Sequence, residues 1–115
     1  MATLADVRAL ALTLPRTSEH LIHDRVKFRV KQIVYCAFSR EETLMGFAFP
    51  REERADLVAR DDRYVMPGTS DLRFNWVACH VALLDLEEME ERVCEAWAMC
   101  VPKFLVRERL GPPVL

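Results

Sequence analysis

The fold is decided by the stretch RVKFRVKQIVYCAF, residues 25–38. Over residues 25–31, basic and apolar side chains alternate with a period of two, as in a strand with one buried and one solvated face. Residues 33–38 are rich in β-branched and aromatic side chains, which favours a second strand. Lys31-Gln32 is expected to form the tight turn between the two strands, although neither residue is a strong turn former.

A third strand is expected after the polar break at Arg40-Glu41-Glu42, because residues 43–49 alternate loosely and end at Pro50. Three consecutive strands with short links predict an antiparallel meander. Upstream, apolar residues recur at helical spacing from Thr3 to Leu14. Thr3 suits the N-cap of this helix, and Pro15 ends it because the residue before a proline disfavours helix.

Downstream of the meander the pattern returns to helical periods. We expect a short helix over residues 50–61, a turn-rich loop over residues 66–71 and one or two strands within residues 72–84. A longer helix is predicted over residues 85–101, with Asp85 and Glu88 close to a capping box. Residues 103–115 are expected to fray. The predicted order α-β-β-β-α-β(β)-α indicates an α+β fold, with helices on one face of an antiparallel sheet in two layers.

Composition excludes several classes of protein. With 115 residues, the chain fits one domain. No apolar run approaches the ~20 residues of a membrane span, and residues 1–15 lack the pattern of a signal peptide. We therefore expect a cytoplasmic protein without a membrane partner, whose four cysteines are reduced and mostly buried.

Charge is unevenly distributed. The whole chain has a formal net charge of −2, whereas a dedicated DNA-binding domain is often strongly basic. Five basic side chains against one acidic side chain give residues 24–40 a net charge of +4. One basic against six acidic side chains give residues 85–101 a net charge of −5. The first region is suited to face an anion, while the second keeps the protein soluble.

Several segments resemble, in order and spacing, those of the MmcQ/YjbR family of small bacterial proteins. They are Thr13-Leu14-Pro15 with Glu19, KFRVKQIVY at 27–35, GFAFP at 46–50, SDLRFNWV at 70–77 and AWAMCVPK at 96–103. The resemblance implies a single α+β domain over residues 1–104, followed by a tail over residues 105–115. It also implies a layout similar to secretion chaperones, and the family's DNA-binding description implies a role in contacting DNA.

The basic stripe of residues 25–31 is the main candidate site. Side chains two apart on a strand stand roughly 6.5–7 Å from each other, close to the phosphate spacing of a nucleic-acid strand. The alternative is a solvated face whose charges pair with neighbouring acids. The candidate nucleic-acid contacts are Arg25, Lys27, Arg29 and Lys31, joined by Arg73 and Lys103 if their elements lie beside the stripe.

Most aromatic residues are expected in the core, with Tyr35 and Trp76 as the exceptions whose polar tips seek a partner. Aromatic side chains outside the core would offer stacking platforms for bases. The core set comprises Phe28, Phe38, Phe47, Phe49, Phe74 and Trp97.

No catalytic or cofactor site is predicted. His20 and His23, on one face of a helical turn, would supply too few ligands for zinc. Cys79 and His80 would point to opposite faces of a strand, so they cannot act as nucleophile and base. The acidic residues of the last helix are interpreted as solvating charge. The three glycines are too sparse for a nucleotide-binding loop.

The leading interpretation is therefore a non-enzymatic protein that binds DNA weakly through phosphates. The alternative is a protein-interaction module, a chaperone-like or adaptor domain that works as a homodimer or with a partner chain. A third interpretation, an enzyme acting on a small molecule, would need a concave pocket with convergent polar groups.

Overall fold

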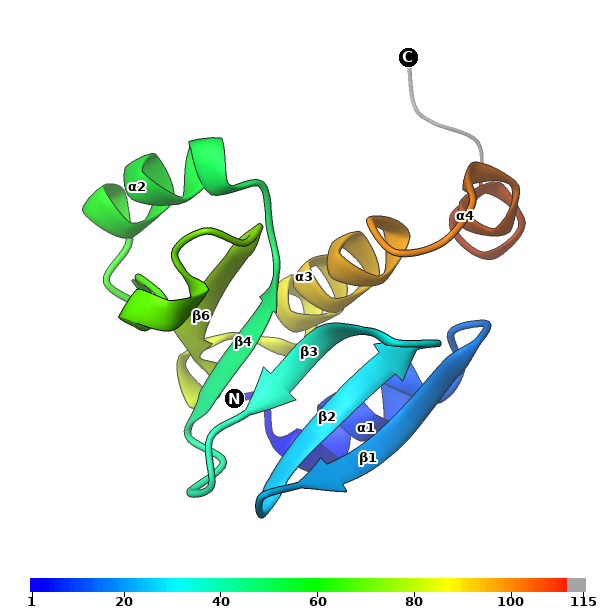
Figure 1. The fold of residues 1–115 in the computed structure, drawn as a ribbon, viewed down its shortest axis with the longest axis horizontal. Coiled ribbons are helices and arrows are strands. Elements are labelled where there is room, and N and C mark those ends of the chain that lie inside the picture. The colour runs from blue at the N-terminus through cyan, green and yellow to red at the C-terminus, as the bar shows by residue number, and fades with distance from the viewer. Residues whose placement is uncertain (112–115) are drawn as a thin grey trace.

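The meander predicted from residues 25–49 forms the centre of a six-stranded antiparallel sheet (Figure 1). The computed structural model describes residues 1–111. The strands are β1 (Thr17–Ile22), β2 (Arg25–Val30), β3 (Ile33–Phe38), β4 (Leu44–Ala48), β5 (Tyr64–Val65) and β6 (Trp76–His80), in the spatial order β1-β2-β3-β4-β6-β5. The helices are α1 (Leu4–Ala11), α2 (Arg51–Arg60), α3 (Leu86–Ala98) and α4 (Lys103–Leu110).

Two tight turns hold the first three strands together. Lys31 has a φ of 56°, and Val30 pairs with Ile33 across the predicted Lys31-Gln32 turn. At the preceding turn, His23 and Asp24 both have positive φ, 53° and 62°, as a type I′ hairpin turn requires. The Lys31-Gln32 turn is thus confirmed, with its strain located at Lys31.

Strand β1 was not predicted. Its sequence, TSEHLI, lacks the β-branched and aromatic enrichment of a central strand. It forms because it is an edge strand whose six residues all pair with β2. As a result, His20 lies on β1 and His23 in the turn, so the helical turn considered for this pair is wrong.

The helix ends follow their capping residues. Thr3 and Asp6 form a capping box at the start of α1, and Asp85 accepts a hydrogen bond from the Glu88 amide at the start of α3. Helix α1 ends at Ala11 instead of Leu14, because the amides of Thr13 and Leu14 bond in tight turns to the carbonyls of Leu10 and Ala11.

The segment expected to fray is helical from Lys103 to Leu110, so that prediction is wrong for these residues. Tertiary contacts order the helix: Leu105 is buried, the Arg16 guanidinium lies 6.0 Å from the Phe104 ring, and Arg109 donates to the Thr13 hydroxyl. The remainder of the expected tail, residues 112–115, lies outside the described residues.

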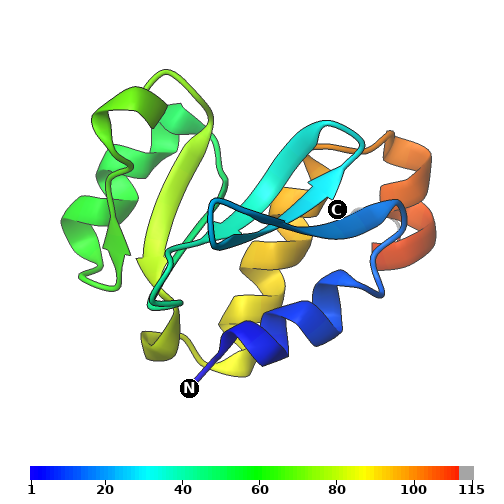
Figure 2. The ribbon, with the colours of Figure 1, turned by 60° about the horizontal axis from the view of Figure 1, so that its bottom comes forward.

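Helices cover one face of the sheet, as predicted (Figures 1 and 2). Helices α1 and α3 pack on each other, and α3 packs on β3 and β4, while α2 lies against β5 and β6. The core between the layers includes Phe28, Phe47 and Trp97, whose indole donates to the Pro15 carbonyl at 2.9 Å. The α+β class is confirmed, and the opposite face, called the outer face below, is left open. Among residues 1–111, no helix is both long and apolar enough to cross a membrane.

Candidate functional site

Strand β2 presents its basic residues on the outer face. Val26, Phe28 and Val30 are buried toward the helices, while the alternate residues Arg25, Lys27 and Arg29 are exposed or half-buried. Lys31 lies one residue beyond the strand, in the exposed turn. Three of the four stripe residues therefore share one strand face, and the fourth extends the row into the turn.

The cations of this row are not neutralised. Within residues 1–111, none of the four forms an ion pair with a carboxylate. Arg25 instead donates from Nε to the Phe38 carbonyl at 3.0 Å, and Arg29 Nη2 lies 3.1 Å from the His20 ring nitrogens. The buried Nε of Arg29 has no hydrogen-bond partner. The positive charges of these four side chains are thus not compensated by ion pairs among the described residues.

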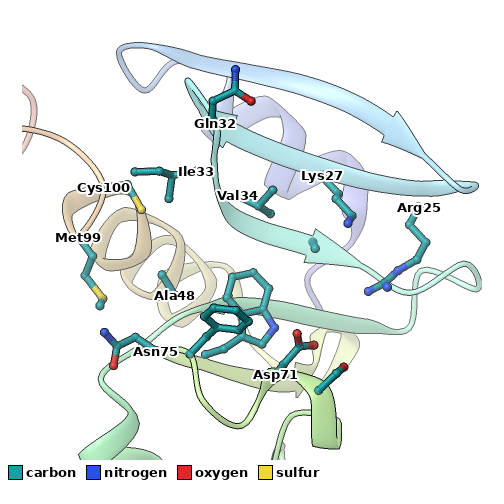
Figure 3. Close-up of a pocket in the computed structure, with 14 residues that line it drawn as sticks. Arg25, Lys27, Gln32, Ile33, Val34, Ala48, Asp71, Asn75, Met99 and Cys100 are labelled. Carbon is teal, nitrogen blue, oxygen red and sulfur yellow. The ribbon is translucent and has the colours of Figure 1, made fainter.

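An open groove of about 700 Å³ runs beside this row (Figure 3). Arg25 and Lys27 extend into it from β2, Asp71 faces them from the opposite wall, and Asn75 lies farther along that wall, beside Met99. Ile33, Met99 and Cys100 close one end. Three segments distant in sequence therefore meet at the groove.

The floor of the groove is built from small residues and one indole. Ala37 on β3 and Ala48 on β4 line it, and Ala37 pairs with Gly46 on β4. Trp76 lies over Gly46, since a Cβ at position 46 would come within 2.5 Å of the indole nitrogen. Trp76 is half-buried and lines the groove, which agrees with its expected place outside the core.

Arg54 on α2 fixes the wall that carries Phe74 and Trp76. Arg54 is only 7 % exposed, and its guanidinium donates to the carbonyls of Phe74 at 2.9 Å, Trp76 at 3.1 Å and Leu72. This role of Arg54 was not predicted from the sequence. A signal was present, because Arg54 stands three residues before Leu57 on the apolar stripe of its helix, where a charge needs a buried partner.

The other predicted contacts lie elsewhere. Arg73 stacks over the Phe74 ring at 4.7 Å, and Lys103 begins α4. Neither lines the groove. Phe74, expected in the core, is 50 % exposed because residues 72–75 form a loop before β6. Tyr35 was expected outside the core, and this prediction is wrong: Tyr35 is fully buried, and its hydroxyl finds a partner in that of Thr17 at 2.9 Å.

A second polar cluster joins β5 to α3 on the helix side. Arg63 donates to Asp61 at 2.8 Å and to Glu88 at 3.0 Å, and Glu88 also accepts from the Tyr64 hydroxyl. These bonds to Arg63 lower the pKa of Asp61 to about 2. Arg92 completes the cluster by donating to the Tyr64 oxygen at 2.8 Å. Glu88 thus links two elements, although its place among the acidic residues of the last helix predicted only a solvating charge.

The thiols are free, and their environment holds them protonated. Cys36 and Cys79 are buried, and burial raises the pKa of Cys79 to about 12. His80 is exposed on the opposite side of β6, as the strand pattern predicted. In the part of the chain that the structure describes, no three His, Cys, Asp or Glu side chains are grouped as metal ligands.

Comparison with known proteins supports the fold. The YjbR family model matches residues 12–99. The structure is similar to a crystal structure of the Deinococcus radiodurans protein DR2400, which contains a DUF419 domain, with a TM-score of 0.72 and 17 % sequence identity. The alignment covers 98 % of this chain and 91 % of that chain. No curated protein matches the sequence. Because the family model spans most of its length, the chain belongs to the YjbR family.

Proposed function

We propose that this protein binds DNA through its outer face, by phosphate contacts from Arg25, Lys27, Arg29 and Lys31. The observation that carries the proposal is the row of four cations that form no ion pair within residues 1–111. Unpaired cations on an open surface attract a polyanion, because releasing its counterions favours binding.

Charge separation supports the same interface. The acidic residues of α3 that are exposed, Glu87, Glu90, Glu91 and Glu95, lie on the helix side of the sheet, away from β2. The net charge of −2 is therefore the sum of positive charge on the outer face and negative charge on the helix side. Such a field orients a polyanion toward β2 during encounter. Phosphate contacts position a protein without reading bases, so the proposed binding has little sequence preference.

The test compares two double variants that each remove two positive charges. Arg25→Ala/Lys27→Ala alters the outer face, whereas Arg60→Ala/Arg107→Ala removes two exposed cations from α2 and α4 that do not line the groove. Fluorescence anisotropy of labelled DNA is measured over a series of salt concentrations. Each lost phosphate contact lowers the slope of log affinity against log salt by about 0.7–0.9.

We expect the outer-face variant to lose roughly two such contacts and the control variant to behave like the unmodified protein. Equal losses in the two variants would show that only overall charge matters. The absence of any binding at about 50 mM salt, where phosphate contacts are strong, would contradict the proposal.

A protein-interaction role is the second candidate, because three exposed apolar side chains border the groove. Ile33 is 52 %, Phe74 50 % and Met99 45 % exposed. Clustered apolar surface of this kind often marks a contact between proteins. Sedimentation velocity across a concentration series tests it: a dimer that dissociates in Ile33→Ser favours this role, and a strict monomer counts against self-association.

A further inference from the structure

We infer that the groove holds unstacked bases of a single strand, so that the protein binds single-stranded DNA in preference to duplex DNA. This inference rests on the proposed phosphate contacts and adds where the bases of the bound DNA lie. A duplex keeps the faces of its bases inside the stack. A single strand exposes them to aromatic side chains.

The groove has the size and shape for such a ligand. Its volume of about 700 Å³ lies within the roughly 300–1,000 Å³ of typical ligand sites. It is open at the surface, so the bases of a strand can enter it from solvent. Small side chains on the floor, Ala37 and Ala48, leave the space free for a planar group.

Two aromatic rings supply stacking surfaces. Trp76 lines the groove beside Phe74, which is 50 % exposed. Three hydrogen bonds from Arg54 hold the backbone of this segment, including both aromatic residues. The backbone that carries the rings is therefore held in place before a ligand arrives, which lowers the entropy cost of binding. The Arg73 guanidinium lies 4.7 Å from the Phe74 ring centre and covers one face, so a base would stack on the other face. Exposed aromatic side chains at fixed positions are an arrangement that stacks on any base.

The polar groups set an orientation for the strand. Arg25 and Lys27 stand on the β2 wall, where they would meet phosphates, and Asp71 and Asn75 stand on the opposite wall (Figure 3). Within residues 1–111 the Asp71 carboxylate has no ion-pair partner, so it repels phosphate and accepts from amino groups on base edges. The Asn75 side-chain oxygen accepts from the Arg51 amide at 3.1 Å, which leaves its NH₂ group as a donor. Backbone and base of a single strand would thus lie on different walls.

The experiment uses the full chain with a labelled 12-nucleotide strand, a duplex hairpin of equal charge and free deoxycytidine monophosphate. The informative variant is Phe74→Ala, and the matched control is Phe104→Ala on α4, where the ring is 56 % exposed and does not line the groove. Because both rings are exposed, neither change removes a core residue. Anisotropy gives the affinities for strand and duplex, and competition gives that of the monophosphate.

We expect the strand to bind at least tenfold more tightly than the duplex at equal salt. Phe74→Ala should weaken strand binding about 5- to 150-fold, the equivalent of the roughly 1–3 kcal/mol per stacked base. Duplex binding, and both affinities of Phe104→Ala, should stay unchanged. Trp76 emission should be quenched by the strand, whereas Trp97, buried and bonded to Pro15, should not respond.

The possible outcomes separate a failure of this inference from a failure of the proposed DNA binding. Equal affinity for strand and duplex, with no effect of Phe74→Ala, overturns the inference but leaves the phosphate contacts standing if Arg25→Ala/Lys27→Ala still weakens binding. A monophosphate that binds as tightly as the strand overturns the preference for a strand. No salt-dependent binding of either nucleic acid overturns the proposed function as well.

Discussion

The indole of Trp76 occupies the space in which a side chain at position 46 would stand. A Cβ on Gly46 would lie 2.5 Å from the indole nitrogen and 2.8 and 2.9 Å from two of the ring carbons. Glycine at this position of β4 therefore keeps the Trp76 ring against the sheet, as the floor of the groove. The absence of a side chain at Gly46 thus determines where the Trp76 ring packs and, through that ring, the shape of the groove.

We predict that Gly46→Ala destabilises the protein and displaces Trp76. The added methyl group forces the ring to move, and overpacking of this kind costs about 1–3 kcal/mol. Urea unfolding gives the free energy of unfolding, and Trp76 emission reports the displacement. Gly68→Ala is the matched control, because nothing lies within 4 Å of its Cβ and its φ is −60°. A change in Gly46→Ala no larger than in this control would contradict the close contact.

Arg54→Met should destabilise the protein and loosen the loop before β6. The substitution leaves the carbonyls of Leu72, Phe74 and Trp76 without their donor, and each unsatisfied group costs about 1–3 kcal/mol. We expect a loss of at least about 2 kcal/mol and faster hydrogen exchange in residues 72–76. Arg60→Met, an exposed position on the same helix, should change stability by less than about 0.5 kcal/mol. Similar results for the two variants would rule out a holding role for Arg54.

The Asp61–Arg63 pair should make stability depend on pH in the acid range. The pKa of Asp61 is lowered to about 2 in the folded protein, below its usual value near 3.9 when unfolded. A lowered pKa means that the contribution is present above about pH 4 and is lost as pH falls toward 2. Asp61→Asn should therefore flatten part of the pH dependence of the free energy of unfolding between these values. Asp62→Asn, at the exposed neighbouring position, should leave this pH dependence unaltered. If both variants flatten it, the Asp61–Arg63 pair is not the source of the pH dependence.

Occupancy of the groove should protect Cys100 from alkylation. Cys94 and Cys100 are both half-buried, and burial raises the pKa of each thiol, so both should react slowly with maleimide. Only Cys100 lines the groove. Mass spectrometry after brief labelling, with and without the 12-nucleotide strand, should show protection at Cys100 and none at Cys94. Equal protection of both thiols would place the strand elsewhere or indicate a global change.

The meander could be predicted because its signal is local. Alternation along residues 25–31 reports a half-buried strand directly, so the burial of Val26 and Phe28 and the exposure of Arg25 followed from the sequence. Strand β1 and helix α4 could not be predicted in this way. Strand β1 is ordered by its neighbour β2 across the His23-Asp24 turn, and its own residues carry only a weak strand pattern. Helix α4 is ordered by partners distant in sequence, such as Thr13 for Arg109.

Only one wall of the groove, the one that carries the basic stripe, could be predicted from the sequence. The basic stripe was visible because four cations recur at a strand period, but its opposite wall depends on where the loop of residues 70–75 folds back. Phe74 was placed in the core because it was expected within a strand, where large aromatic side chains usually pack inside. It is exposed because residues 72–75 form a loop before β6, and this loop is held by Arg54, a residue whose burial depends on tertiary contacts.

The walls of the groove come from β2–β3, from residues 70–76 and from the end of α3, so it exists only when the whole domain is folded. Whatever occupies it must therefore hold these segments together and oppose unfolding. At a concentration one hundred times its dissociation constant, such a ligand adds about 2.7 kcal/mol of stability, enough to raise the melting temperature by several degrees. A thermal-shift screen of nucleic acids, nucleotides and peptides would thus detect an occupant of the groove from any of these classes.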